Sequence, residues 1–136
     1  MLFLPASNKV IYQPLGVVGI MVPWNYPLFL SLGPLIGALS AGNRVMIKLS
    51  EFTPNFNKCL KEVLAEIFDE NQVAVITGEV TISSEFSSLP FDHMFFTGST
   101  PIGRLVMASA AKNLTPVTLE LGGKSPVIIS ADIVIK

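Results

Sequence analysis

The chain has 136 residues, of which half are hydrophobic and 14% are charged, and its net charge at pH 7 is -1. This composition is too apolar for a disordered protein, and it offers no basic stripe for binding nucleic acid. A single cysteine excludes an internal disulfide framework, so we expect a reducing compartment, the cytoplasm. Residues Met1–Asn8 show no secretory leader pattern.

The first predicted elements lie in a stretch from Val10 to Asn43 that carries no charge. Such a stretch is the first sign of a membrane helix, but prolines interrupt it repeatedly. These prolines are Pro14, Pro23, Pro27 and Pro34. We therefore predict no membrane span, but a buried strand over Leu15–Val22 and an apolar helix over Leu28–Ala41.

The rest of the chain alternates short apolar strands with helical patterns. The predicted strands are Arg44–Ile47, Gln72–Ile76, Asp92–Phe96, Val117–Leu119 and Val127–Ile129. The predicted helices begin at Thr53–Pro54, at Glu79 and at Thr100–Pro101, with Thr53 and Thr100 as N-caps, and the last helix ends near Asn113. This alternation favours an α/β fold, a Rossmann-like parallel sheet with helices on both faces.

Polar residues follow three of these strands directly. Trp24 and Asn25 come after the first strand, Lys48 and Glu51 after the second, and Gly98–Thr100 after the fourth. In an open parallel sheet, ligands bind outside the carboxyl ends of the strands. We therefore predict a binding cleft at that edge of the sheet.

The segment Gly98–Gly103 lies where the fourth strand passes into a helix. Free N–H groups at a helix start attract phosphate, Gly98 permits close backbone approach, and Ser99 offers a hydroxyl. The spacing differs from the usual dinucleotide fingerprint of three glycines, Gly-x-Gly-x-x-Gly. From these residues alone, an ordinary capped helix is an equally good interpretation.

Three further side chains are candidates for polar chemistry. Glu51 and Lys48 are placed to bind ribose hydroxyls, although an isolated pair of this kind is more often a solvated charged turn. Asn25 lies between two prolines that fix the backbone, which suits an oxyanion hole, although asparagine commonly stabilises its own turn.

Glu120 precedes Gly122–Gly123, which let a ligand lie against the backbone. A carboxylate in an apolar cleft can act as a general base, while the alternative is an exposed glutamate at a strand end. We interpret His93 as structural. Cys59 falls within a predicted helix, beside its apolar face, and we expect a buried structural thiol there.

Taken together, these motifs resemble the aldehyde dehydrogenase family from about Tyr12 to Ser130. The most specific motif is Leu119-Glu-Leu-Gly-Gly-Lys-Ser-Pro126, reinforced by Pro23-Trp-Asn25 and Phe96-Thr-Gly-Ser-Thr100. Within the family, the segments Val22–Leu35 and Asn113–Glu120 are most similar to the coniferyl aldehyde dehydrogenase branch.

The resemblance implies oxidation of an aldehyde to an acid with NAD, or alternatively NADP. It implies that Asn25 holds an oxyanion and that Glu120 activates water to hydrolyse a thioester formed on a cysteine. Trp24 and Ser99 match pyrophosphate contacts, and Lys48 and Glu51 match ribose contacts. The full set of cofactor residues implied is Val22, Pro23, Trp24, Lys48, Ser50, Glu51, Gly98, Ser99, Gly103, Leu121 and Gly122, and no metal is implied.

Two departures from the family pattern affect this interpretation. The nucleophilic cysteine of the family follows the Glu-Leu-Gly-Gly-Lys motif, and the chain reaches Lys136 without one. Leu49 stands where many members have proline. We therefore expect residues 1–136 to be a partial NAD(P)-binding domain, without the catalytic and oligomerisation segments of a homo-oligomeric family, and inactive alone. The alternatives are a non-catalytic nucleotide-binding module and a poorly folded gene remnant.

Overall fold

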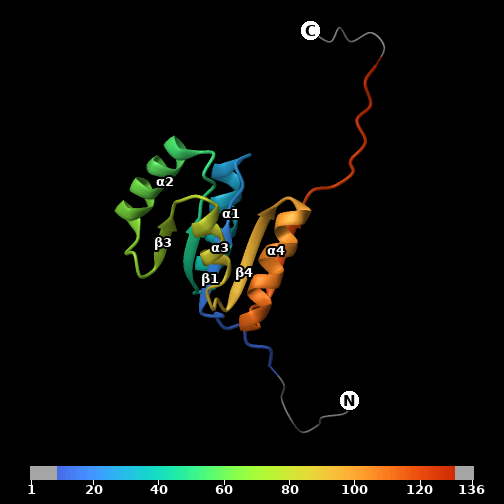
Figure 1. Ribbon diagram of the computed structural model, residues 1–136. Helices are drawn as coiled ribbons and strands as arrows, with labels where there is room; N and C mark the ends of the chain where they lie inside the picture. The colour runs from blue at the N-terminus through green and yellow to red at the C-terminus, as the bar shows by residue number, and fades with distance from the viewer. Residues whose placement is uncertain (1–8, 131–136) are drawn as a thin grey trace, which may run out of the picture.

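A computed structural model describes residues 9–130, so the leader prediction for Met1–Asn8 lies outside the described residues. Strands and helices alternate along the described chain, as predicted (Figure 1). The elements are β1 (Val17–Met21), α1 (Pro27–Ser40), β2 (Arg44–Lys48), α2 (Pro54–Ile67), β3 (Val73–Ile76), α3 (Val80–Ser87), β4 (His93–Gly98), α4 (Thr100–Ala110), the 3-10 turn η1 (Ala111–Asn113) and β5 (Val117–Leu121).

The five strands form one parallel sheet in the order β3-β2-β1-β4-β5. Met21 of β1 is level with Lys48 of β2 and with Phe96 of β4, so the carboxyl ends of these strands meet at one edge. From β1 at the centre, the chain adds β2 and β3 on one side, then crosses over to add β4 and β5 on the other. The predicted α/β class and parallel sheet are therefore confirmed.

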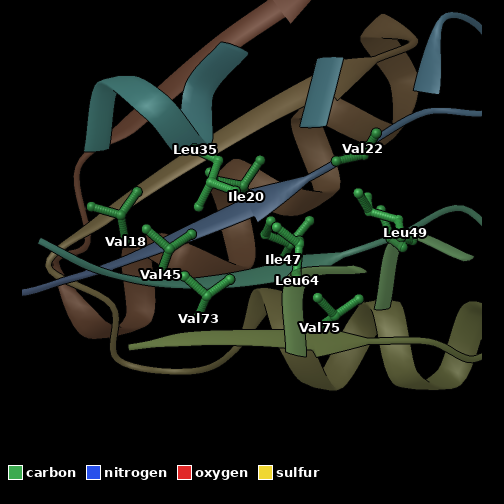
Figure 2. Packing of buried hydrophobic residues seen from close by; sticks show 11 residues of the cluster. Val18, Ile20, Val22, Leu35, Val45, Ile47, Leu49, Leu64, Val73 and Val75 are labelled. Atoms are coloured by element: carbon green, nitrogen blue, oxygen red, sulfur yellow. The ribbon is translucent and has the colours of Figure 1, made fainter. Parts of the chain in front are cut away.

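Helices cover both faces of the sheet, as predicted. On one face, α1 and α2 pack on alternate side chains of the strands, including Val18 and Ile20 of β1 (Figure 2). On the other face, Phe86 of α3 and Val106 of α4 pack on the intervening side chains of the strands, such as Met94 and Phe96 of β4. Every strand except the edges thus buries both faces, which explains the near-continuous apolar runs in the sequence.

The C-terminal elements differ from the prediction in two respects. The predicted strand over Val127–Ile129 does not form; these residues are exposed, and residues 122–130 extend away from the sheet (Figure 1). A short apolar run becomes a strand only where a neighbouring strand supplies hydrogen-bond partners. β5 instead runs two residues beyond its predicted end, to Leu121, because β4 pairs with it that far.

Helix α2 confirms one prediction and corrects another. Thr53 occupies the predicted N-cap position, although its hydroxyl makes no capping bond and instead faces Asn57 Oδ1 at 2.9 Å and the carbonyl oxygen of Ser50 at 3.2 Å. Cys59 is exposed rather than buried, because the contact face of α2 is narrow and centres on Leu60 and Leu64.

Two further expectations concern α4 and α1. The N-cap of α4 is Ser99, one residue earlier than predicted, which places Thr100 and Pro101 inside the first turn. α1 begins at Pro27 and ends at Ser40, close to the predicted bounds. Within residues 9–130, no helix combines the length and apolar character needed to cross a bilayer.

Candidate functional site

A cavity of about 1040 Å³ opens at the carboxyl edge of the sheet. It lies where the strand order reverses, between the ends of β1 and β4, and open α/β sheets bind ligands at this switch point. The predicted site residues that line it are Val22, Pro23, Trp24, Asn25, Lys48, Ser50, Glu51, Gly98, Ser99, Glu120, Leu121 and Gly122. Thus four separate segments of the chain converge on one space.

The turn after β1 presents Trp24 and Asn25 to the cavity. Tyr26 adopts a left-handed conformation, with φ 49° and ψ 44°, and its carbonyl oxygen accepts the first hydrogen bond of α1, from Leu30. Such a conformation is costly for a residue with a side chain, and persists only where neighbours enforce it. Within the described chain, the Asn25 amide makes no hydrogen bond, so it is not consumed in stabilising its own turn.

Lys48, at the end of β2, points its charge into a confined space. Only 2% of its surface is exposed, and its ammonium donates to the carbonyl oxygen of Leu49 at 2.7 Å. Burial lowers the pKa of Lys48, and the nearby Glu51 carboxylate offsets part of that effect. Lys48 and Glu51 therefore interact electrostatically, which an isolated solvated turn would not require.

The turn that carries Glu51 is fastened to α2. Ser50 is buried, and its carbonyl oxygen accepts from Asn57 Nδ2 at 2.7 Å. The Ser50 hydroxyl accepts from the backbone N–H of Phe52 at 3.3 Å. Ser50 therefore shapes the turn through both its backbone and its side chain.

The junction of β4 and α4 brings backbone close to the cavity. A Cβ on Gly98 would lie 2.6 Å from the ring of Phe96, so only glycine fits there without a shift of that ring. Ser99 occupies the N-cap position of α4 without a side-chain capping bond, so the N–H groups of the first turn have no helical partners. Gly103 alone among the predicted cofactor residues does not line the cavity; a Cβ on it would lie 2.8 Å from the Leu121 side chain.

Glu120 lies opposite Thr97, near the end of β5. It lines the largely apolar cavity, but it is exposed, as in the alternative interpretation of a glutamate at a strand end. The physical reason is its position: β5 is an edge strand with a neighbour on one side only.

Sequence reasoning missed residues that line the cavity from the helices. Phe29, Leu30, Gly33 and Pro34 of α1 and Val80 and Ser83 of α3 belong to this group. Their helical spacing was visible, but nothing in the sequence shows which face of a helix turns toward a cleft. Thr97 also lines the cavity, and its buried hydroxyl oxygen has no hydrogen-bond partner among the described residues.

Comparison with known proteins agrees with this geometry. The sequence model of the "Aldehyde dehydrogenase family" matches residues 5–136. The chain belongs to the aldehyde dehydrogenase family. Among curated aldehyde dehydrogenases, it is 66% identical over 134 residues to the "Probable coniferyl aldehyde dehydrogenase" of Pseudomonas aeruginosa. It is 50% identical over 129 residues to the "Coniferyl aldehyde dehydrogenase" of a Pseudomonas species. The predicted resemblance to this branch of the aldehyde dehydrogenases is confirmed.

Solved aldehyde dehydrogenases share the fold. The substrate-bound AldH of Staphylococcus aureus superposes with a TM-score of 0.83 at 49% identity, over 88% of this chain and 26% of that one. An aldehyde dehydrogenase of Mycobacterium tuberculosis, complexed with NAD+, gives a TM-score of 0.76 at 43% identity, over 82% and 24%. The two Pseudomonas matches cover 98% and 95% of this chain, but 28% and 27% of the relatives. The chain thus spans about a quarter of their length.

Proposed function

We propose that residues 1–136 are part of the NAD(P)-binding domain of an aldehyde dehydrogenase and hold the dinucleotide in the cavity at the switch point. The observation that carries this proposal is the convergence of Trp24, Glu51 and Ser99, from three different strand ends, on one cavity. The NAD+ complexes of related aldehyde dehydrogenases from two bacteria support it.

The arrangement suits a dinucleotide laid across the sheet edge. Ser99 and the free N–H groups of the first turn of α4 would bind the pyrophosphate, together with Trp24. Lys48 and Glu51 would bind ribose hydroxyls, and Gly98 would let the backbone approach the phosphates. Val22, Pro23, Ser50, Leu121 and Gly122 would form the walls. Gly103 would act indirectly, by letting α4 pack closely on β5.

The bound nicotinamide supplies a hydride acceptor, and the residues of the chain supply the polar groups around it. The Asn25 amide, held rigid by Pro23 and Pro27 and free of other bonds, would donate to the oxyanion formed on the aldehyde carbon. Glu120 would accept a proton from the water that hydrolyses the thioester.

The cysteine nucleophile of this reaction is not supplied by Cys59, the single cysteine of these 136 residues. Cys59 lies on the exposed side of α2 and does not line the cavity. We therefore propose that the 136-residue chain alone binds the dinucleotide without oxidising an aldehyde, which corresponds to the non-catalytic nucleotide-binding module. NADH formation by the purified chain on adding an aldehyde, lost in Glu120→Gln, would contradict this.

The aldehyde of the whole protein is proposed to be aromatic. Two relatives carry the name coniferyl aldehyde dehydrogenase, and Phe29 and Trp24 bring aromatic surface to the cavity. Aromatic rings stack on such surfaces. Assembly of the whole protein into a homo-oligomer and its location in the cytoplasm stay predictions.

Calorimetry on the purified chain tests the binding proposal. Titration with NAD+ is expected to give saturable heat at a ratio of one dinucleotide per chain. Cys59→Ser is the matched control, because this residue is exposed and outside the cavity, and it is expected to bind equally well. A folded chain that shows no heat with NAD+, NADP+ or ADP would exclude the proposal.

A further inference from the structure

Two donors occupy the carbonyl oxygen of Ser50. Asn57 Nδ2 donates at 2.7 Å and the backbone N–H of Thr53 at 3.3 Å, which uses both lone pairs of the oxygen. The Thr53 hydroxyl lies 3.2 Å from the same oxygen, but its single proton has a nearer acceptor in Asn57 Oδ1 at 2.9 Å. Asn57 is 4% exposed and Ser50 is 8% exposed, so water does not compete effectively for these groups.

The bond from Asn57 completes a chain of fixed carbonyl groups along the cavity wall. The oxygen of Lys48 accepts from Val22 at 3.0 Å, and that of Leu49 accepts from the Lys48 ammonium at 2.7 Å. The third, on Ser50, is the one held by a side chain from a helix. Glu51 follows at once and lines the cavity, so Asn57 fixes the backbone from which the Glu51 side chain projects.

Packing alone does not explain an asparagine at position 57. With Leu60 and Leu64 it forms the buried face of α2, where an apolar residue would be expected. Burying an amide is costly unless it is hydrogen-bonded, and asparagine is a weak helix former. Both ends of this amide are used in the turn, since its oxygen accepts from the Thr53 hydroxyl at 2.9 Å.

We propose that Asn57 is a positioning residue of the nucleotide site, which acts through the Ser50 carbonyl oxygen to set the placement of Glu51 and hence dinucleotide affinity. The ligand identity rests on the proposed function, whereas the positioning itself does not. Removing the amide frees the turn and lowers affinity without removing any atom that lines the cavity, since Asn57 itself does not line it.

The test compares Asn57→Ala with Asn43→Ala. Asn43 is also buried, at 7% exposed, and its side chain makes three hydrogen bonds, to Leu15, Gly16 and Ala38, against two for Asn57. These bonds lie just before β1, away from the cavity. Trp24 is the single tryptophan and lines the cavity, so its fluorescence reports NAD+ binding. The dissociation constant for NAD+ is expected to rise about tenfold in Asn57→Ala and to stay within about twofold in Asn43→Ala, at similar losses of thermal stability.

Thr53→Val provides a milder second variant if Asn57→Ala does not fold. It removes the hydroxyl that holds the Asn57 side-chain oxygen at 2.9 Å and lies 3.2 Å from the Ser50 oxygen, and is expected to weaken NAD+ binding about two- to threefold. Equal dissociation constants in wild type and in both turn variants would overturn the proposal, as would an equal weakening by Asn43→Ala.

Amide hydrogen exchange separates this proposal from the proposed function. If the wild-type chain does not bind NAD+, the function fails, but the positioning still predicts faster exchange at Glu51, Phe52 and Thr53 in Thr53→Val and Asn57→Ala. Asn43→Ala is expected to leave these three amides unchanged. Unchanged exchange in the turn variants would overturn the positioning role.

Discussion

Lys48 is a charged side chain with almost no exposed surface, and this has a consequence for stability at alkaline pH. Its pKa in the folded chain is lowered by burial below the ordinary value of 10.5. Below the lowered pKa, folded and unfolded chains both hold the proton, and the cost of burying the charge is fully present. As pH rises from there to 10.5, the folded chain releases the proton first and the cost disappears.

Lys48→Met tests this linkage. The free energy of unfolding of the wild type, minus that of the variant, is expected to rise with pH in that window and to be flat just below it. The variant keeps a side chain of similar length, so the core stays filled. Urea denaturation at a series of alkaline pH values measures both chains, and a constant difference up to pH 10.5 would contradict the prediction.

We expect Glu51 to determine the preference for NAD+ over NADP+. Its carboxylate lines the cavity beside Lys48, and a 2′-phosphate placed there would meet a like charge. Glu51→Gln is therefore expected to narrow the preference for NAD+ over NADP+ by about tenfold, mostly through tighter NADP+ binding. Calorimetric titrations of both dinucleotides into both chains measure this, and equal wild-type affinities would refute the preference.

At the scale of the element, two glycines in helices make a matched pair. Gly37 in α1 has open space where a Cβ would stand, whereas a Cβ on Gly103 in α4 would lie 2.8 Å from Leu121. Gly37→Ala is expected to stabilise the chain by about 0.5–1 kcal/mol, because alanine favours the helix. Gly103→Ala gains the same propensity but is expected to stabilise less than Gly37→Ala, because the Leu121 side chain must shift to admit the Cβ. Thermal unfolding of the two variants compares them directly.

The sequence predicted elements well where their signals are local. Prolines at the starts of α1, α2 and α4 marked those helices, because proline is favoured in the first helical turn, although α1 also contains Pro34 in its interior. Short strand-like runs were less informative: Val117–Leu119 became a strand and Val127–Ile129 did not, although the second run is the more apolar and the richer in β-branched residues. Val117–Leu119 forms a strand because it pairs with β4, and such pairing depends on the tertiary structure rather than on the local sequence.

The candidate site, too, was predictable where topology alone determines it and not where tertiary contacts do. Residues at strand ends were predicted to meet, and they do, since a parallel sheet places its carboxyl ends together. The exposure of Cys59 and Glu120 was not predictable, because it depends on which neighbours cover α2 and β5. Asn57 was overlooked for a related reason: the sequence does not show which groups a buried asparagine is hydrogen-bonded to.

At the scale of the whole molecule, two apolar clusters share one sheet. Leu64 belongs to the cluster under α2, and Val106 belongs to the cluster under α4 on the opposite face. Because β1 contributes to both clusters, loss of either is expected to unfold the chain as a unit, in contrast to a poorly folded remnant.

Leu64→Ala is expected to cost about 2–5 kcal/mol and Val106→Ala somewhat less, as fewer atoms are removed. The two losses are expected to be nearly additive in the double variant, because the sheet separates the sites. Urea unfolding followed by Trp24 fluorescence and by circular dichroism is expected to give one coincident transition in every variant. Separate transitions would show that the faces unfold independently.

The position of β1 at the centre of the sheet also has a kinetic consequence. Its pairing with β2 joins nearby residues, but its contact with the β4 side spans 75 positions, from Val17 to Asp92. Contacts of long sequence separation form slowly, since a large loop must close first. The cavity lies along this boundary between β1 and β4, where the N-terminal part of the chain meets the C-terminal part. A dinucleotide that bridges the boundary between β1 and β4 would therefore bind only a chain in which these strands have paired, and would slow their separation during unfolding.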